Sequence, residues 1–254
     1  MNRAVTTAAL LAACTLGTTD VARAQEATQG WSGKGELGYV VSHGNSESES
    51  ANAKLEATLG YERWKHGFFL GALYGRNTNV TSAQRLETRI QTDYQTTRRL
   101  FAFGAFRYQD DRFSGFDYQA STSVGMGYRF IDSDTTRLAG RVGVGYQRLR
   151  PETLVKDANG VVIDRVHGPT TSSALGTVGI DYEHELNEHV RIIDKFLVDS
   201  GLSNTSLQNE FSLQVKMTEK LALSAGYAVR DNTNPPPGLK KLDTVTTQNI
   251  VYGF

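Results

Sequence analysis

The sequence has few of the features that identify several common classes of protein. It contains one cysteine and 5 prolines among 254 residues, and its 27 basic side chains are balanced by 27 acidic ones. A chain without net charge or runs of one sign has no electrostatic reason to bind nucleic acid, so we expect no nucleic-acid partner. After Gln25, no uncharged apolar run approaches the roughly 20 residues that a membrane-spanning helix needs. These absences argue against a disulfide-stapled domain, a nucleic-acid-binding protein and a helical membrane protein.

The first 24 residues predict an export signal. Arg3 provides a short positive region, residues 9–16 provide a modest apolar stretch, and the triplet ARA ends in a small-residue cleavage site at Ala24. Cleavage there leaves residues 25–254 as one domain without cysteine. A lipoprotein signal is the alternative, because the segment LAAC at residues 11–14 resembles a lipobox.

Apolar residues alternate with polar ones over long segments of the chain. In residues 49–62 an apolar side chain recurs at every second position, a stretch about twice the usual strand length. The same period recurs along the chain and predicts about 12 strands. Two segments are ambiguous: residues 100–108 are apolar on both faces, and residues 190–198 place Asp194 on the otherwise apolar face.

The connections between these strands alternate between long and short. Residues 76–84 and 150–169 read as long loops, whereas residues 96–99 and 218–220 read as short turns. Aromatic side chains gather at the ends of the apolar rows, as they do at both interfaces of a bilayer. We therefore predict an all-β fold: an antiparallel transmembrane β-barrel with short periplasmic turns and longer extracellular loops, in the outer membrane of a Gram-negative bacterium. Outer-membrane lipid and lipopolysaccharide are its expected surroundings. A soluble lipocalin-like barrel or sandwich is the alternative, because alternation alone does not say which face is wet.

The chain ends with an aromatic row, in the segment TVTTQNIVYGF. Ile250, Tyr252 and Phe254 share one parity, and this ending resembles the signal by which outer-membrane proteins reach the barrel-assembly machinery. Together with the segments WSGKGELGYVVSHGNSESES and YQDDRFSGFDYQ, the ending is similar to a family of uncharacterised, salt-induced outer-membrane proteins defined by a domain of unknown function. The resemblance runs from Trp31 to Phe254. It implies location and fold, and it implies no activity.

Several motifs with the letters of a chemical site do not have its geometry. In HELNEH (residues 184–189) the two histidines are one residue too far apart for a zinc-binding helix, so we expect a turn. In GKGELG (residues 33–38) no helix follows to receive a phosphate. The serines, histidine and asparagine of residues 42–46 are neighbours in one loop, where a catalytic alignment is rare. We therefore predict no catalytic residue, no cofactor and no metal. Loop aspartates that bind Ca²⁺ or lipopolysaccharide cations are the alternative: Asp110, Asp111 and Asp117.

The polar parity of the strands predicts the inner face of the barrel. Mixed charges at this density require either a wet lumen or a packed network of ion pairs. The expected lining residues are Lys34, Glu36, Lys54, Glu56, Glu87, Arg89, Asp93, Arg129, Arg137, Arg141, Asp181, Glu183, Glu210, Lys216 and Arg230. Arg137 and Arg141 are the expected constriction.

These features predict a non-enzymatic barrel that is either a narrow, weakly selective channel for small solutes or a structural component of the envelope. A lipid-modifying barrel enzyme and an adhesive or cation-binding surface protein are the alternatives. Pore width, solute and oligomeric state stay open, because about 12 strands lie between the barrels that side chains fill and the wide porins.

Overall fold

The computed structural model describes residues 30–42, 48–77, 80–112, 114–158, 162–202, 204–236 and 240–254. These residues form a sheet of 13 strands. The strands are β1 (Gly30–Ser42), β2 (Ser48–Tyr61), β3 (Trp64–Asn77), β4 (Val80–Gln95), β5 (Leu100–Asp111), β6 (Phe116–Asp132), β7 (Thr136–Lys156), β8 (Val162–His167), β9 (Thr171–Glu185), β10 (Val190–Gly201), β11 (Thr205–Lys216), β12 (Leu221–Asn232) and β13 (Leu242–Gly253). Within these ranges, the chain has no helix of the length and apolarity that crossing a membrane requires.

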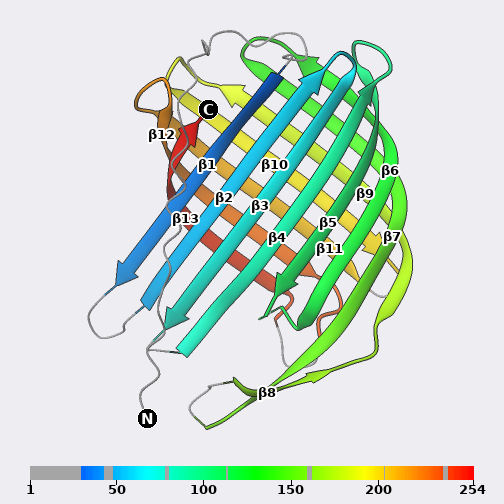
Figure 1. Cartoon of the computed structure of the whole chain (residues 1–254), viewed down its shortest axis with the longest axis vertical. Helices are drawn as coiled ribbons and strands as arrows, with labels where there is room; N and C mark the ends of the chain where they lie inside the picture. Colours follow the sequence, from blue (N-terminus) through cyan, green and yellow to red (C-terminus); the bar gives the residue numbers. More distant parts are fainter. Residues whose placement is uncertain are drawn as a thin grey trace.

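The sheet closes on itself as a barrel (Figure 1). Neighbouring strands are antiparallel throughout, and closure comes from β1 against β13, where Leu37 faces Ile250, and from β6 against β7. The short strand β8 stands outside the wall, because it pairs only with the outer end of β7. Without β8, 12 of the 13 strands form the wall, which confirms the predicted fold class and strand count.

The strands extend further than the sequence pattern predicted. Residues 76–84 were expected to form a long loop, but β3 reaches Asn77 and β4 begins at Val80. Residues 150–169 contain the outer part of β7 and all of β8, which return as a hairpin beyond the wall at the end opposite the C-terminus (Figure 1). The ladder hydrogen bonds satisfy the backbone in lipid and in water alike, so pairing continues past the apolar rows.

The two faces of the wall have opposite chemistry. Large apolar side chains on the outer face are exposed, including Val124, Val142 and Val144 at more than 60%. The buried side chains are mostly polar or charged, as at Glu87 and Asn249. A soluble barrel would have the reverse arrangement. The wall is therefore built for hydrocarbon on the outside and polar groups inside, as in an outer-membrane barrel.

The two ambiguous segments are strands whose faces break the pattern locally. In β5, Phe101 and Phe103 share the inward parity with Arg107, which explains the apolar residues on both faces. In β10, Asp194 lies opposite Phe211, on the outward parity, and accepts a hydrogen bond from Nδ2 of Asn209 (2.6 Å). The carboxylate is thus hydrogen-bonded to a polar side chain of the neighbouring strand, on a face that is mostly apolar.

Candidate functional site

Side chains on the inner face reach across the barrel. Arg107 on β5 donates from Nη2 to Oε1 of Gln208 on β11 (2.7 Å). Arg230 on β12 donates to Glu87 on β4 (2.9 Å) and to Gln109 on β5 (3.0 Å). In the closed order of the strands, β4 and β5 lie opposite β11 and β12. These contacts therefore cross the interior and do not run along the wall.

The crossing side chains form a set that we call the transverse network. Its charges balance, because three arginines meet three carboxylates and two amides: Arg89, Arg107, Arg230, Glu87, Asp199, Glu210, Gln109 and Gln208. Glu87 lies at the centre, with its carboxylate 2.9 Å from Arg230, 3.1 Å from Arg107 and 3.3 Å from Arg89. Its side chain is 3% exposed. A buried charge of this kind is tolerable only when it is paired and hydrogen-bonded, and here both conditions are met.

A second crossing contact joins β10 to β2. Nζ of Lys195 lies 3.3 Å from Oε1 of Glu56, and Glu56 is also 3.7 Å from Nζ of Lys34. Lys34 contacts Oε1 of Glu36 at 3.0 Å, while Oε2 of Glu36 accepts a hydrogen bond from Asn249 (3.0 Å). We call this chain of contacts the second bridge. It adds another connection between opposite parts of the wall.

The transverse network and the second bridge separate two cavities. The larger, of about 500 Å³, extends toward the short turns and is lined by Asp93 and Arg129 among others. The smaller, of about 100 Å³, is lined by Lys34, Glu36, Lys54 and Thr247 among others. Glu56, Lys195 and Glu210 line both cavities, and so belong to the partition between them. The interior is therefore divided by polar side chains.

The residues expected to line the lumen lie on the inward parity of their strands and take part in different contacts. Four belong to the transverse network: Glu87, Arg89, Glu210 and Arg230. Three belong to the second bridge: Lys34, Glu36 and Glu56. Lys54 lines the smaller cavity, and Lys216 is exposed at the end of β11. The others line the larger cavity: Asp93, Arg129, Arg137, Arg141, Asp181 and Glu183.

Arg137 and Arg141, which we expected to form a constriction, pair along the wall. Nη2 of Arg137 lies 2.8 Å from Oε1 of Glu183, and Arg141 contacts Asp181. Both partners are on the adjacent strand β9, where Glu183 directly faces Arg137. The register supplies each guanidinium with a nearby carboxylate, so neither needs to reach across. The crossing contacts lie elsewhere, in the transverse network and the second bridge.

Five side chains that make or support the crossing were not predicted from the sequence: Arg107, Gln109, Lys195, Asp199 and Gln208. Arg107 and Lys195 lie inside the two ambiguous segments, where no inward face was assigned. The register pairs Arg107 with Arg89 and Lys195 with Glu210. Pairing each ambiguous strand with its clearly alternating neighbour would therefore have placed both residues on the inner face.

The interior side of β5, β6 and β7 is filled by aromatic rings over glycines. Phe101 and Phe103 are buried, and the positions that face them on β6 are Gly127 and Gly125. A Cβ at Gly125 would lie 2.8 Å from Cε1 of Phe103, and one at Gly143 on β7 would lie 2.9 Å from its Cζ. The rings need glycine at these positions to lie against the backbone. We call these five residues the aromatic wall.

The C-terminal row lies on the outer face at the seam of the barrel. Ile250 and Tyr252 are exposed on β13, and Phe254 follows the end of the strand. The backbone of Phe254 exchanges two hydrogen bonds with Gly33 on β1, each of 2.9 Å. The row thus adjoins the contact that closes the barrel. Its recognition by the assembly machinery stays a prediction.

The remaining motifs are placed as follows. In HELNEH, His184 lies near the end of β9 and shares a hydrogen bond with Oγ1 of Thr136 (2.8 Å), while His189 lies in a turn capped by Asn187. The glycines of GKGELG lie within β1. His43 and the proposed cleavage site at Ala24 lie outside the described residues. Of the loop aspartates, Asp111 pairs with Arg85 (2.5 Å), on the inner face.

Comparisons with known proteins identify a family and a relative of this chain. Residues 35–254 match the family described as "Protein of unknown function, DUF481". The chain is 22% identical over 223 residues to the Uncharacterized protein YdiY of Escherichia coli (strain K12), covering 85% of this chain and 81% of that protein.

Two solved structures are similar over most of the chain. The NanC porin has a TM-score of 0.48 and 11% identity, covering 87% of this chain and 98% of the porin. An outer membrane channel from Pseudomonas putida F1 has a TM-score of 0.48 and 8% identity, covering 89% of this chain and 96% of the channel. At such low identity, neither structure indicates what passes through the barrel described above.

Proposed function

The chain belongs to the family described as "Protein of unknown function, DUF481", and from that premise we propose that it is an outer-membrane barrel whose lumen is held closed by the transverse network. In this proposal the protein is a structural component of the envelope of a Gram-negative bacterium. Its outer face contacts lipid and lipopolysaccharide, and its interior stabilises the barrel without serving as an open pore.

The observation that carries the proposal is the direct contact between opposite sides of the wall. Arg230 reaches Glu87 at 2.9 Å and Arg107 reaches Gln208 at 2.7 Å, without an intervening water-sized gap. Opening the network would separate three partly buried arginines from the three carboxylates that balance their charge. Separating such pairs in a site of low dielectric costs several kcal/mol, about 3 to 5 when one partner is lost.

A narrow channel is the second candidate, and the larger cavity favours it. That cavity, of about 500 Å³, has basic and acidic residues in its lining, including Arg129, Arg137, Asp93 and Glu183. A path that opened through the transverse network would pass between groups of both signs. Such a channel is expected to discriminate weakly between anions and cations.

We also propose that the barrel is not an enzyme. Two hydroxyl–imidazole pairs occur in the described part of the chain, Thr92 with His66 (3.1 Å) and Thr136 with His184 (2.8 Å). Nucleophilic catalysis needs a third group that orients the base. Among the hydrogen bonds of the described residues, none joins the imidazole of His66 or His184 to a carboxylate or amide that could orient it.

Recordings from planar bilayers test the proposal. Folded protein, checked by its heat-modifiable mobility on a gel, is expected to insert without steady conductance steps. Steady, weakly selective steps from the wild-type barrel would contradict the closed lumen and support the narrow channel. An open porin of known conductance, inserted under the same conditions, controls for the sensitivity of the recording.

A further inference from the structure

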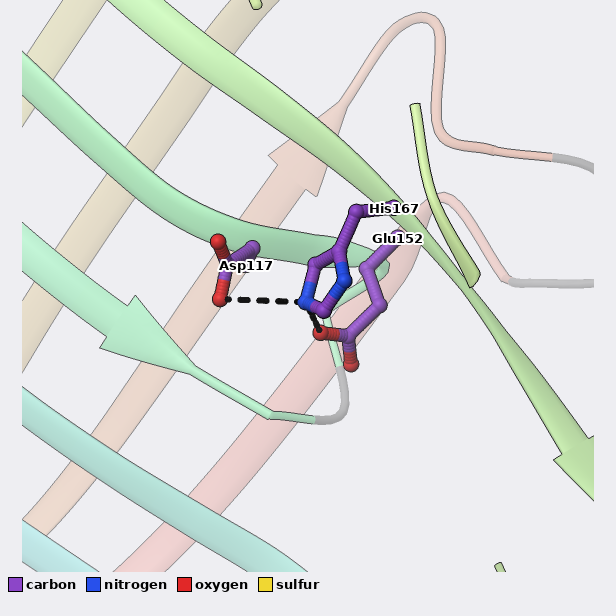
Figure 2. A group of neighbouring side chains, drawn as sticks. All are labelled: Asp117, Glu152 and His167. Atoms are coloured by element: carbon purple, nitrogen blue, oxygen red, sulfur yellow. Dashed lines mark ion pairs between the residues drawn. The ribbon is translucent and has the colours of Figure 1, made fainter. Parts of the chain in front are cut away.

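Three side chains converge at the outer end of the barrel, on the side of the β8 hairpin. Figure 2 shows Asp117, Glu152 and His167 directed toward one another from β6, β7 and β8. Nε2 of His167 lies 3.2 Å from Oε2 of Glu152 and 3.6 Å from Oδ1 of Asp117. One ligand-type atom from each residue lies within 4.8 Å of the other two. In the sequence, Asp117 stands near Asp110 and Asp111 and far from Glu152 and His167, so nothing in it connects the three residues.

Local strand geometry brings these residues together. Glu152 and His167 face each other directly in the β7–β8 ladder, so their side chains leave the same face of the hairpin. Asp117 falls at a register shift between Phe116 and Tyr118, where β6 pairs with β7. A bulge of this kind re-aims a side chain, and bulges are common beside functional sites. The backbone N–H of Glu152 also donates to the carbonyl of Gly115 (2.8 Å), which fixes β7 against the start of β6.

Each carboxylate divides its two oxygens between an arginine and the shared centre. Arg165 contacts Oε1 of Glu152, which leaves Oε2 facing His167. Arg150 lies 3.3 Å from Oδ2 of Asp117, which leaves Oδ1 facing His167. Outer partners that hold ligand side chains in position are a regular part of metal sites. The arginines therefore orient the carboxylates and leave one oxygen of each available.

The distances from Nε2 of His167 to the two carboxylate oxygens that face it match those between ligands around one small ion. Ligands bound to Zn²⁺ at about 2.0 to 2.2 Å in a tetrahedron lie about 3.4 Å from one another. The two distances from Nε2, 3.2 and 3.6 Å, fall on either side of that value. The side chain of Glu152 is buried, whereas those of Asp117 and His167 are about one third exposed. The group is thus closed on the protein side and open to solvent, which leaves a position for water.

We propose that Asp117, Glu152 and His167 bind a divalent transition-metal ion of the Zn²⁺ class at the outer rim of the barrel. The imidazole decides the class, because Ca²⁺ and Mg²⁺ prefer oxygen ligands in larger number. A bound ion joins the β8 hairpin to β6 and β7, so the site fastens the hairpin to the wall. The proposal does not depend on whether the lumen is open or closed.

Calorimetric titration of detergent-folded, lipopolysaccharide-free protein with ZnCl₂ tests the site. Wild type is expected to bind one ion, and His167→Ala and Asp117→Asn are each expected to weaken binding by at least about 10-fold, because loss of even an outer partner of a ligand typically costs about 10- to 100-fold in affinity. His189→Ala is the matched control, because it removes an exposed imidazole from a short turn at the other end of the barrel. Its affinity should equal that of wild type.

Two results of the zinc titration would overturn the proposal. One is wild-type protein that takes up no Zn²⁺, which would leave the three residues as an ion-paired cluster only. The other is Zn²⁺ binding of equal strength in wild type and in folded His167→Ala. Titration with CaCl₂ adds a second comparison: Ca²⁺ binding that survives His167→Ala and displaces Zn²⁺ would identify a carboxylate site without the imidazole, contrary to the proposal.

Discussion

The transverse network and the aromatic wall fill one interior by different means. In the transverse network, Glu87, Arg107 and Arg230 extend from opposite strands and meet in the middle. In the aromatic wall, Phe101 and Phe103 on β5 lie against glycines of β6 and β7, on the same side of the barrel. The first arrangement depends on the matching of charges across the barrel, and the second depends on the shape of neighbouring strands. Substitutions in the transverse network should therefore destabilise the barrel by leaving charges unpaired, and substitutions in the aromatic wall should destabilise it by steric overlap.

The largest effect is expected at the centre of the transverse network. Glu87→Ala leaves three guanidiniums around an empty position and should lower the free energy of unfolding by about 3 to 5 kcal/mol. Urea unfolding of the barrel in detergent measures this change. Glu183→Ala is the control, because it removes a partly exposed carboxylate that contacts Arg137 and Arg191 along the wall. It should cost about 1 kcal/mol or less. Equal losses of unfolding free energy would mean that the crossing contacts stabilise the barrel no more than the ion pairs along the wall do.

The next largest effect is expected on β6, the strand that supports the aromatic wall. The same substitution should have different costs on its outer and inner faces. Val124→Arg places a guanidinium in hydrocarbon and should cost about 2 to 4 kcal/mol. Ser123→Arg places the same group next to the larger cavity, which Ser123 lines, and should be mild. Both free energies come from urea titrations of barrels refolded into lipid vesicles. A similar loss from both substitutions would contradict the assignment of the faces.

A smaller effect is expected from crowding the aromatic wall itself. Gly143→Ala brings a Cβ to 2.9 Å from the ring of Phe103 and 2.6 Å from the carbonyl oxygen of Val124, so it should cost about 1 to 3 kcal/mol. Gly104→Ala is the matched control, because a Cβ there would meet no atom within 4 Å. Thermal unfolding of the two variants should differ. If Gly143→Ala is as stable as Gly104→Ala, the rings do not depend on glycine.

The smallest effect on the assembled barrel is expected at its seam. Deleting Phe254 removes the two hydrogen bonds to Gly33 and leaves the network and the aromatic wall in place. If the C-terminal row is an assembly signal, the yield of heat-modifiable barrel in outer membranes should fall while barrels that do form keep most of their stability. A wild-type yield after the deletion would show that the row serves only to close the sheet.

The fold could be predicted from the sequence because lipid and water impose a strict alternation on each strand. Residues 49–62 show the principle, since β2 follows the period of two from Ser48 to Tyr61. The ends of the strands were harder to predict, because backbone pairing continues where the side-chain pattern stops, as at residues 76–84.

The contacts between side chains could not be predicted in the same way. Parity places Glu87 and Arg230 on the inner face, but their contact depends on which strands lie opposite each other after closure. The cluster of Asp117, Glu152 and His167 was harder still to predict, because its three residues are far apart in the sequence and Asp117 is directed by a register shift. A bulge leaves no mark in an alternation pattern that is read one strand at a time.

Single-channel conductance of one balanced variant tests the closed lumen most directly. Glu87→Ser, Gln208→Ser and Arg230→Ser together shorten one acid, one amide and one base, and they remove the three hydrogen bonds that cross from β4 and β5 to β11 and β12. The control Arg137→Ser with Glu183→Ser removes a pair along the wall. We predict steady conductance from the folded triple variant and silence from wild type and control. A folded triple variant as silent as wild type, or a wild type that already conducts, would contradict the claim that the transverse network closes the barrel.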